Sequence, residues 1–536
     1  MASDSAQPTT IAAAKTRTSV KETITSIVIA FALAFVFRGF VVEAFVIPTG
    51  SMAPTLNGAH VRARSPLTGY EFAVGPRDYT NPSMQVPLPM QGTTVKPLQL
   101  TDPMSAAELR LAGAATRWGD RIFVLKYLAG IYDPARFDVV VFKNPTDPTI
   151  NFIKRLVGLP GEMVALADGD VFTRTPQQND ASGGNPWALA GWKCRTKPAH
   201  AQRAMWQPVF DGSYAPLPSD NSAVFTPPWK PATDTESSRW RLNPTGEYQY
   251  AGPGPAALRW DGAPFRVTDE YPYNQSMRPT LLFPVSDVRM SLGLRPSKDG
   301  MPISAVLFAR KHEFRLDIDG QTVSLRMRST ETPDASWQEL GGGGLDAPMP
   351  AGVVTNVEFW HVDQTLQCWI NDKLITSGVY DWTPADRVKY ATRPSFEDIA
   401  QRPTSLIDGG IYTRPEMRWE FGGGDFTVYR VRLDRDIHYQ ANTYPQAPNM
   451  PALSTHPSAT LTLGSNEYFC CGDNSPSSLD GRLWSDVHPW VETINPTPGV
   501  VSRDLMIGKA FFVYFPSPVK RWMVPVPDVG HMRWIW

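Results

Sequence analysis

A long apolar run near the start of the chain constrains its fold most. The segment Ile24–Phe37 contains no charged residue, and apolar residues continue to Ile47, interrupted by Arg38 and Glu43. A helix needs about 20 mainly apolar residues to cross the hydrocarbon core of a bilayer. An arginine near the end of such a helix can extend its charge to the lipid headgroups. The sequence therefore predicts a transmembrane helix over residues 23–46.

The charges around this run predict its orientation. Lys15, Arg17 and Lys21 precede it, and basic residues favour the cytoplasmic side of a membrane segment. Residues 1–22 are therefore expected in the cytoplasm, and the chain after the span outside it. A single crossing is expected. Two alternatives stay open at this point: a cleavable signal peptide, whose small-x-small pattern would be Ala32-Leu33-Ala34, and a buried core helix.

Composition indicates a β-rich chain without a nucleic-acid partner. The 536 residues include 51 prolines, 40 glycines and 11% aromatic residues, a mixture typical of strands joined by many turns. The formal net charge is −1, which does not favour binding to a polyanion. The four cysteines (Cys194, Cys368, Cys470 and Cys471) lack the spacing of a metal site. A bridge between Cys194 and Cys368 stays open, and no metal or organic cofactor is expected.

A serine and a lysine form the candidate catalytic pair. Ser51 lies in "VIPTGSMAPTL", directly after the apolar run, and Lys154 lies in "TINFIKRLVGLPGE". A serine hydroxyl needs a base, and lysine can serve when burial lowers its pKa. A strand there would turn Phe152 and Lys154 to one face, and Ile153 and Arg155 to the other. Each residue alone has a plainer explanation, because loop serines usually face water and a strand lysine often protects a sheet edge.

Several sequence blocks together resemble the bacterial type I signal peptidases, membrane-anchored Ser–Lys proteases that remove signal peptides from exported proteins. The blocks are "IPTGSMAPTL", "GDRIFVLKY", "DPARFDVVVFKNP", "NFIKRLVGLPGE", "EYFCCGDNSPSSLDGRLW" and "IGKAFFVYFP". The resemblance implies a β-rich catalytic core on the outer side of the cytoplasmic (inner) membrane. It also implies two partners, the signal peptides of preproteins and the lipid bilayer.

The resemblance implies roles for further residues. Thr49, with the backbone N–H of Ser51, would form an oxyanion hole. Ser478 would hydrogen-bond the lysine, and Asp480 would pair with Arg482 to brace the same loop, with Arg155 as a further supporting residue. The last block departs from the family pattern, because Ser475 and Gly481 stand where an arginine and a serine are usual. A substrate would pair with the strand before Ser51, and shallow pockets would be lined by Ile47, Leu56, Phe152 and Ile153.

The resemblance leaves two long stretches unexplained. The predicted organisation is a first catalytic segment over 47–180, with an insertion at about 58–118, and a second catalytic segment over 456–536. Within the first insertion, "SPLTGYEFAVG" resembles a zinc knuckle that has lost both cysteines, so zinc is not expected. Residues 181–455 form the larger insertion.

Alternating strands and tight turns predict a β-sandwich in this larger insertion. Hairpins are expected around Asp319-Gly320 and Asn371-Asp372, a further strand over 425–437, and a flexible connection at Gly341–Gly344. The pattern resembles concanavalin-like or jelly-roll sandwiches. Trp360 and Trp369 are interpreted as core aromatics rather than a sugar platform. A surface protein or glycan partner for this insertion stays open.

The predicted fold is thus mainly β: a transmembrane helix, a signal-peptidase-type catalytic core and an inserted sandwich. The favoured function is a membrane-bound serine endopeptidase. The alternative is a catalytically inactive, membrane-anchored protein that binds a partner through its sandwich. A self-cleaving regulator of the repressor type is a third hypothesis, which the membrane span disfavours because such regulators are soluble.

Overall fold

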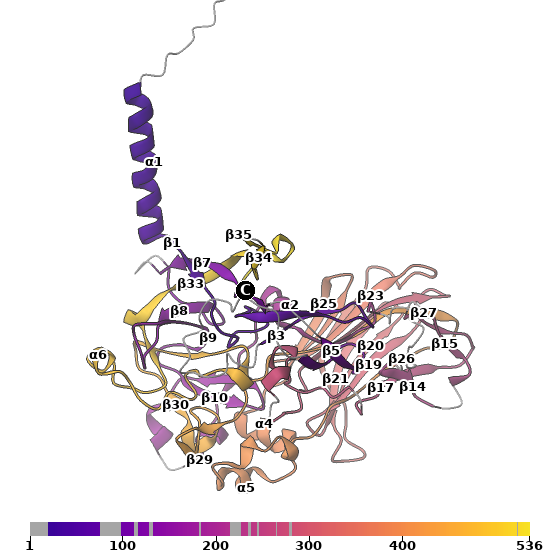
Figure 1. Ribbon diagram of the computed structural model, residues 1–536. Coiled ribbons are helices and arrows are strands. Elements are labelled where there is room, and N and C mark those ends of the chain that lie inside the picture. Colours follow the sequence, from indigo (N-terminus) through magenta and orange to yellow (C-terminus); the bar gives the residue numbers. More distant parts are fainter. Residues whose placement is uncertain are drawn as a thin grey trace, which may run out of the picture.

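The computed structural model is mainly β and describes residues 20–75, 98–111, 116–127, 132–181, 184–214, 227–233, 237–243, 246–263, 265–277, 281–521 and 524–536. A single helix projects from a body in which a catalytic-region sheet lies beside a large β-sandwich (Figure 1). The fold class expected from the sequence is confirmed. Lys15 and Arg17, on which the expected orientation partly depends, lie outside the described residues.

The projecting helix is α1 (Val20–Phe40), and its described side chains are exposed. Within the described residues it is the one helix long and apolar enough to cross a membrane. The helix ends at Phe40 and not at residue 46, where the predicted span of 23–46 ends, because Val42–Val46 instead forms strand β1. β1 pairs with β7 (Arg121–Lys126), and Lys126 Nζ donates to the carbonyl of Gly39 at 2.8 Å. Backbone pairing therefore ends the helix and fixes its base to the sheet.

The catalytic-region sheet has the strand order β1-β7-β33-β8-β9-β31-β32, with β36 paired to β33. Its strands are β8 (Val139–Lys143), β9 (Asn151–Gly158), β31 (Glu467–Cys471), β32 (Val501–Ser502), β33 (Met506–Phe515) and β36 (Arg533–Trp534). β33 lies between β7 and β8, and β31 pairs with β9. Segments before and after the large insertion therefore build one sheet.

Smaller sheets surround this one. Two belong to the first insertion: β2 (His60–Arg64), β3 (Glu71–Val74) and β6 (Thr116–Arg117) form one, and the hairpin β4 (Leu98–Thr101) and β5 (Glu108–Leu111) forms the other. In the segment that resembles a zinc knuckle, the hydroxyls of Ser65 and Thr68 both donate to Asp102. Hydrogen bonds to one carboxylate therefore hold this loop.

A further sheet joins β10 (Met163–Ala167), β11 (Asp170–Arg174), β12 (Lys193–Cys194) and β30 (Leu461–Thr462).

The large insertion contains the predicted sandwich. One sheet has β15, β16, β27, β18, β23, β24 and β25 in order, with β13 paired to β27, and the other has β14, β17, β26, β19, β20, β21 and β22. Their inward residues, such as Leu258, Leu292, Leu307 and Val428, form one buried core. Their bounds are β13 (Gln207–Asp211), β14 (Trp229–Pro231), β15 (Trp240–Leu242), β16 (Tyr248–Tyr250), β17 (Ala256–Trp260), β18 (Val288–Pro296), β19 (Ile303–Ala309), β20 (His312–Asp319), β21 (Thr322–Ser329), β22 (Gln338–Gly344), β23 (Thr355–Val362), β24 (Thr365–Ile370), β25 (Lys373–Val379), β26 (Glu416–Phe421) and β27 (Phe426–Arg435).

Both predicted hairpin turns are present in the sandwich. Asp319 pairs with Thr322 across the first turn, and Ile370 pairs with Lys373 across the second. Asn371 and Asp372 both adopt positive φ, as the tight turn between two twisted strands requires. Trp360 and Trp369 are buried and stack against each other, so their interpretation as core aromatics is confirmed.

The prediction of a flexible connection at Gly341–Gly344 is wrong. These glycines end strand β22, which pairs with β21. A Cβ atom at Gly341 would lie 2.7 Å from the carbonyl oxygen of Ser377 in β25, and one at Gly343 would lie 3.3 Å from that of Ile375. The edge strands of the two sheets approach each other so closely here that side chains at Gly341 and Gly343 would meet the backbone of β25. Packing therefore explains these two glycines, whereas Gly342 and Gly344 face more open space.

Buried charges join the sandwich to the catalytic region. Arg310 Nε contacts Asp168 at 2.6 Å, and its Nη2 contacts Asp287 at 2.6 Å. Arg387, in helix α4 (Pro384–Ala391), contacts Asp168, Asp170 and Asp287 at 3.0, 2.5 and 2.8 Å. All five side chains are buried. Each charge would be costly to bury alone, so this five-residue ionic cluster fixes how the two parts dock.

Candidate active site

The loop that carries Ser51 connects β1 to β2 and is held at both ends by Asp120. The backbone N–H of Ile47 donates to the Asp120 carbonyl at 2.9 Å, and that of Asn57 donates to its carboxylate at 3.0 Å. Asp120 is buried and stands directly before β7. A Cβ atom at Gly119 would lie 1.7 Å from the carbonyl oxygen of Ile47, so the neighbouring residue must be glycine. We call residues 47–57 the nucleophile loop.

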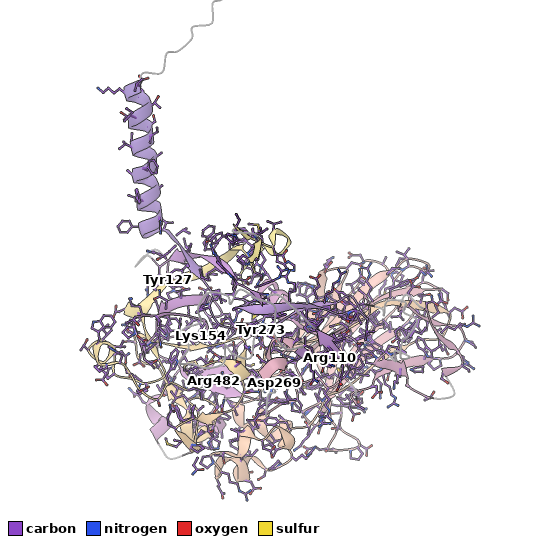
Figure 2. The ribbon with its side chains drawn as sticks, viewed as in Figure 1. Arg110, Tyr127, Lys154, Asp269, Tyr273 and Arg482 are labelled. Carbon is purple, nitrogen blue, oxygen red and sulfur yellow. The ribbon has the colours of Figure 1, made fainter. Side chains whose placement is uncertain are left out.

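Strand β9 presents Lys154 to this loop. Lys154 Nζ lies 2.7 Å from Ser51 Oγ, which is hydrogen-bond distance, and the lysine is 3% exposed. The predicted alternation along β9 is confirmed: Lys154 Nζ lies 5.3 Å from the centre of the Phe152 ring, whereas Ile153 packs into the cluster on the other face. Figure 2 marks Lys154 within the catalytic region. The residues predicted as nucleophile and base, 103 residues apart in the chain, therefore lie in contact.

Burial lowers the pKa of Lys154 to about 8, because an ammonium group is poorly solvated there. The negative charge of Asp480 opposes this shift, and the positive charge of Arg482 adds to it. A lysine with this pKa is partly neutral near pH 7 to 8. It can therefore accept a proton from the hydroxyl beside it.

Asp480 and Arg482 form a fully buried ion pair beneath the site. Arg482 donates from Nε and Nη2 to the two carboxylate oxygens at 2.9 and 2.8 Å. Asp480 also accepts the backbone N–H of Gly472 at 2.8 Å. Ser475, which replaces the usual arginine of the family pattern, accepts a hydrogen bond from Arg482 Nη1 at 2.6 Å and one from the backbone N–H of Gln440 at 2.8 Å. The departure from the pattern is therefore accommodated by hydrogen bonds.

Asp473 and Asn474, whose individual roles the sequence did not indicate, hold the nucleophile loop directly. Asp473 accepts from the Thr55 hydroxyl at 2.7 Å and pairs with Arg155. The backbone N–H of Asn474 donates to the Ser51 carbonyl at 3.1 Å, and its side-chain Nδ2 donates to the Gly50 carbonyl at 2.9 Å. Their positions depend on a contact between segments more than 400 residues apart, which no local pattern reveals.

The expected hydrogen bond from Ser478 to Lys154 is not formed. Ser478 Oγ is buried and has no hydrogen-bond partner within the described residues. It lies against Gly472 instead, since a Cβ atom there would be 2.1 Å from it. Thr49, the predicted oxyanion donor, lies two residues before Ser51 and is exposed. Its backbone packs against Gly58.

The predicted substrate pockets are only partly accessible. Leu56 is 0% exposed and Ile47 is 2% exposed, and both pack in the core below the nucleophile loop. A side chain without exposed surface does not contact a ligand, so these two do not line an open pocket. Phe152 and Ile153 are partly exposed on opposite faces of β9, and of the two only Phe152 lies on the face of Lys154.

Three side chains elsewhere have the chemistry of metal ligands. The ligand atoms of Asp170, Cys194 and Asp363 lie within 4.8 Å of one another. Arg387 already neutralises Asp170 at 2.5 Å, and Lys197 neutralises Asp363 at 2.6 Å. Burial raises the pKa of the Cys194 thiol well above its usual range, so a thiolate is disfavoured. These residues therefore do not fit a metal site.

Comparison with known families matches three separate segments of the chain. The family model "Signal peptidase, peptidase S26" matches residues 20–70, 112–185 and 423–515. These segments contain Ser51, Lys154 and the Asp480–Arg482 pair, and the region between the second and third segments holds most of the sandwich.

Curated relatives match between a quarter and a third of the chain. Signal peptidase I of Pseudomonas aeruginosa is 34% identical over 132 residues, which are 25% of this chain and 30% of the relative. Signal peptidase I of Rickettsia typhi is 26% identical over 158 residues, which are 30% of this chain and 45% of the relative. The chain thus spans less than half the length of these two relatives.

Solved structures give weak matches to this chain. One is the carbohydrate binding module CBM66 from Bacillus subtilis, which covers 39% of this chain and 95% of its own, with 9% sequence identity and a TM-score of 0.22. A likeness at this level assigns neither a fold nor a ligand.

Proposed function

We propose that the chain is a membrane-bound serine endopeptidase of the signal peptidase family, peptidase S26, whose model matches three of its segments. Its substrates are the signal peptides of exported preproteins, which it cleaves on the outer side of the cytoplasmic membrane. Ser51 is the nucleophile and Lys154 is the general base. No metal or organic cofactor takes part in the proposed reaction.

The observation that carries this proposal is the contact between the two side chains. Lys154 Nζ and Ser51 Oγ are 2.7 Å apart, and burial lowers the lysine pKa to about 8. A solvent-exposed lysine would be almost fully charged at neutral pH and could not act as a base. A preformed pair of this kind disfavours the alternative of an inactive binding protein.

The proposed chemistry has two stages. Neutral Lys154 takes the Ser51 proton while Oγ bonds to the carbonyl carbon of the scissile peptide, and the resulting ammonium gives this proton to the departing amine. The signal peptide then remains on Ser51 as an ester. A water molecule, which loses a proton to Lys154, attacks the ester carbonyl, and the ammonium returns that proton to Ser51 Oγ as the ester C–O bond breaks. The Ser51 N–H and the exposed Thr49 hydroxyl supply donors for the oxyanion.

The sheet offers a place for an extended substrate. β1 leads into the nucleophile loop and is the outermost strand in the order of the catalytic-region sheet. An edge strand can pair with a peptide through its backbone groups. A substrate paired to β1 would run toward Ser51, and the partly exposed Phe152 lies on the same face of β9 as Lys154.

The helix α1 supplies the proposed membrane anchor. Its C-terminal end lies directly before β1, and β1 leads into the nucleophile loop (Figure 1). A signal peptide is itself held in the bilayer by its apolar segment. Anchoring enzyme and substrate in the same membrane raises their effective concentration.

Cleavage of a preprotein in vesicles tests the proposal. The full chain, reconstituted in phospholipid vesicles, is expected to shorten a preprotein that carries small residues before its cut site, while Ser51→Ala and Lys154→Ala do not. Lys143→Ala is the matched control, since Lys143 is an exposed lysine on the neighbouring strand β8. Cleavage by Ser51→Ala at the wild-type rate, or no cleavage by the wild-type chain, would overturn the proposal.

A further inference from the structure

The geometry points to Asn274, a residue of the sandwich insertion, as a positioning residue for the nucleophile. This inference rests on the proposed peptidase activity and goes beyond it, because it makes the insertion part of the active site. Asn274 lies in the short 3₁₀ helix η4 (Pro272–Met277), which enters the catalytic region from the insertion. It is buried at 2% exposure.

Asn274 and Asn474 bind each other through both ends of their amide groups. Asn274 Nδ2 donates to Asn474 Oδ1 at 2.7 Å, and Asn474 Nδ2 donates back to Asn274 Oδ1 at 2.9 Å. The second proton of Asn474 Nδ2 goes to the carbonyl of Gly50 at 2.9 Å, and the Asn474 backbone N–H goes to the carbonyl of Ser51 at 3.1 Å. The Asn474 side chain therefore links the insertion to the peptide groups of Gly50 and Ser51.

Two tyrosines of the same segment contact the site independently. Tyr271 donates its hydroxyl to the Asp473 carbonyl at 2.9 Å, and Tyr273 donates its hydroxyl to the Ala59 carbonyl at 2.7 Å. The ring of Tyr273 lies against Gly50, since a Cβ atom there would be 2.0 Å from Cε1 of that ring. Figure 2 marks Tyr273 between the catalytic region and the sandwich. The segment thus encloses the nucleophile loop as well as bonding to it.

The amide pair fixes which way the Asn474 side chain faces. Its two donors and its acceptor are all used, so a rotation that exchanged nitrogen and oxygen would break the bond to Gly50. Without Asn274, Asn474 would keep unpaired polar groups in a buried position, which is costly and favours rearrangement. Any rearrangement moves the Gly50 and Ser51 peptide groups. A displacement of about 1 Å at a reacting group costs roughly 100-fold in rate.

Asn274 is buried, so a bound substrate cannot reach it, and this sets the expected kinetics. We expect Asn274→Ala to lower kcat roughly 10- to 100-fold and to change KM by less than about 2-fold. The midpoint of the pH–rate profile should stay where it is in the wild-type protein, because Asn274 is uncharged. The measurement is steady-state cleavage of a preprotein by the full chain in vesicles.

The adjacent residue provides a matched control. Gln275 is also an amide of η4 and also bonds to the catalytic region, with its Oε1 accepting from the N–H of Thr101 at 2.8 Å and its Nε2 donating to the Thr101 carbonyl at 2.9 Å. These contacts reach β4 and not the nucleophile loop. Gln275→Ala should therefore keep the wild-type kcat. If both variants lose kcat equally, η4 acts only as general support for the fold and the inference is overturned.

A double-mutant cycle separates positioning from stability. If Asn274 acts through Asn474, the variant Asn274→Ala/Asn474→Ala should lose no more kcat than Asn474→Ala alone, whereas independent roles would add. Asn274→Ser keeps a small polar side chain without adding a charge, and replaces Asn274→Ala if the latter is unfolded at the assay temperature. Wild-type kcat in the folded Asn274 variant, or additive losses, would overturn the inference. An inactive wild-type chain would instead overturn the proposed function.

Discussion

Arg155 donates to both carboxylate oxygens of Asp473, at 2.7 and 2.6 Å, and neither side chain is exposed. Arg155 directly follows Lys154 in β9, so this contact holds the strand on one face while the lysine reaches Ser51 on the other. Asp473 also accepts the hydroxyl of Thr55 in the nucleophile loop. One carboxylate therefore links the strand of the base to the loop of the nucleophile.

Cleavage should rise with pH through about 8. The base must be neutral to accept a proton, and burial places the pKa of Lys154 at about 8, so the active form is scarce at pH 6 and dominant at pH 9. The measurement is kcat/KM for preprotein cleavage across this range. Lys154→Arg should be inactive throughout, because a guanidinium keeps its proton. A flat profile from pH 6 to 9 would contradict the assignment of the base.

Asp480→Asn should move this profile to lower pH and destabilise the protein. The Asp480 charge opposes the lowering of the Lys154 pKa, so its removal lets that pKa fall further. Arg482 would also remain as a buried charge without its partner, at a cost of roughly 3–5 kcal/mol in the free energy of unfolding. Denaturant unfolding and a pH–rate profile measure the two effects. Asp346→Asn, which removes an exposed pair with Lys373, should change stability by less than about 1 kcal/mol.

Arg387→Ala should loosen the sandwich from the catalytic region. Its guanidinium contacts Asp168, Asp170 and Asp287, and these carboxylates would stay buried with one cation fewer. Loss of one partner from a buried charge group typically costs roughly 3–5 kcal/mol. The change should appear as a lower midpoint in denaturant and faster cleavage by an added protease. Arg402→Ala, at an exposed position of the insertion, should match the wild-type protein in both assays.

Gly50→Ala should inactivate the chain, and a second substitution should restore part of the activity. The three nearest atoms to a Cβ at Gly50 all belong to Tyr273, at 2.0 to 2.8 Å, and its ring is wedged in place by the bond to Ala59. Tyr273→Ala removes this clash. The double variant should therefore cleave faster than Gly50→Ala alone. Equal rates for these two variants would show that the loss at Gly50 has another cause.

Removal of α1 should separate membrane attachment from chemistry. The helix makes few contacts with the body, since its described side chains are exposed. A chain without Val20–Phe40 should leave the membrane fraction on sedimentation and still cleave a short soluble peptide at a rate within about 3-fold of the full chain. Cleavage of a preprotein embedded in vesicles should slow more strongly, because the shared anchoring is lost. Persistent sedimentation with lipid would contradict α1 as the main anchor.

Local patterns predicted the parts of this molecule that depend on nearby residues. The alternation through Phe152 and Lys154 identified β9 and its two faces, and the turn residues at Asn371 and Asp372 identified a hairpin. Such features follow from the period of a strand and the conformations that a turn allows. The family resemblance added Ser51, which its loop alone would not distinguish from other serines.

Tertiary contacts determined what the sequence did not predict. The glycines of β22 were predicted to be flexible because the residues next to them in the sequence do not indicate the close approach of β25. Leu56 reads as a pocket residue, although the nucleophile loop folds it into the core. The role of Asn274 depends on Asn474, 200 residues further along the chain. Pairings at that distance are set by how the two parts dock.

The position of β33 has a consequence for biosynthesis. This strand separates β7 from β8 in the catalytic-region sheet, yet the ribosome makes it after the entire sandwich. Until residues 506–515 have emerged, β7 and β8 lack the strand that joins them, so β1 and β9 cannot take their places in one sheet. A growing polypeptide therefore holds Ser51 and Lys154 in an unassembled sheet until the whole sandwich has been made and β33 has followed it.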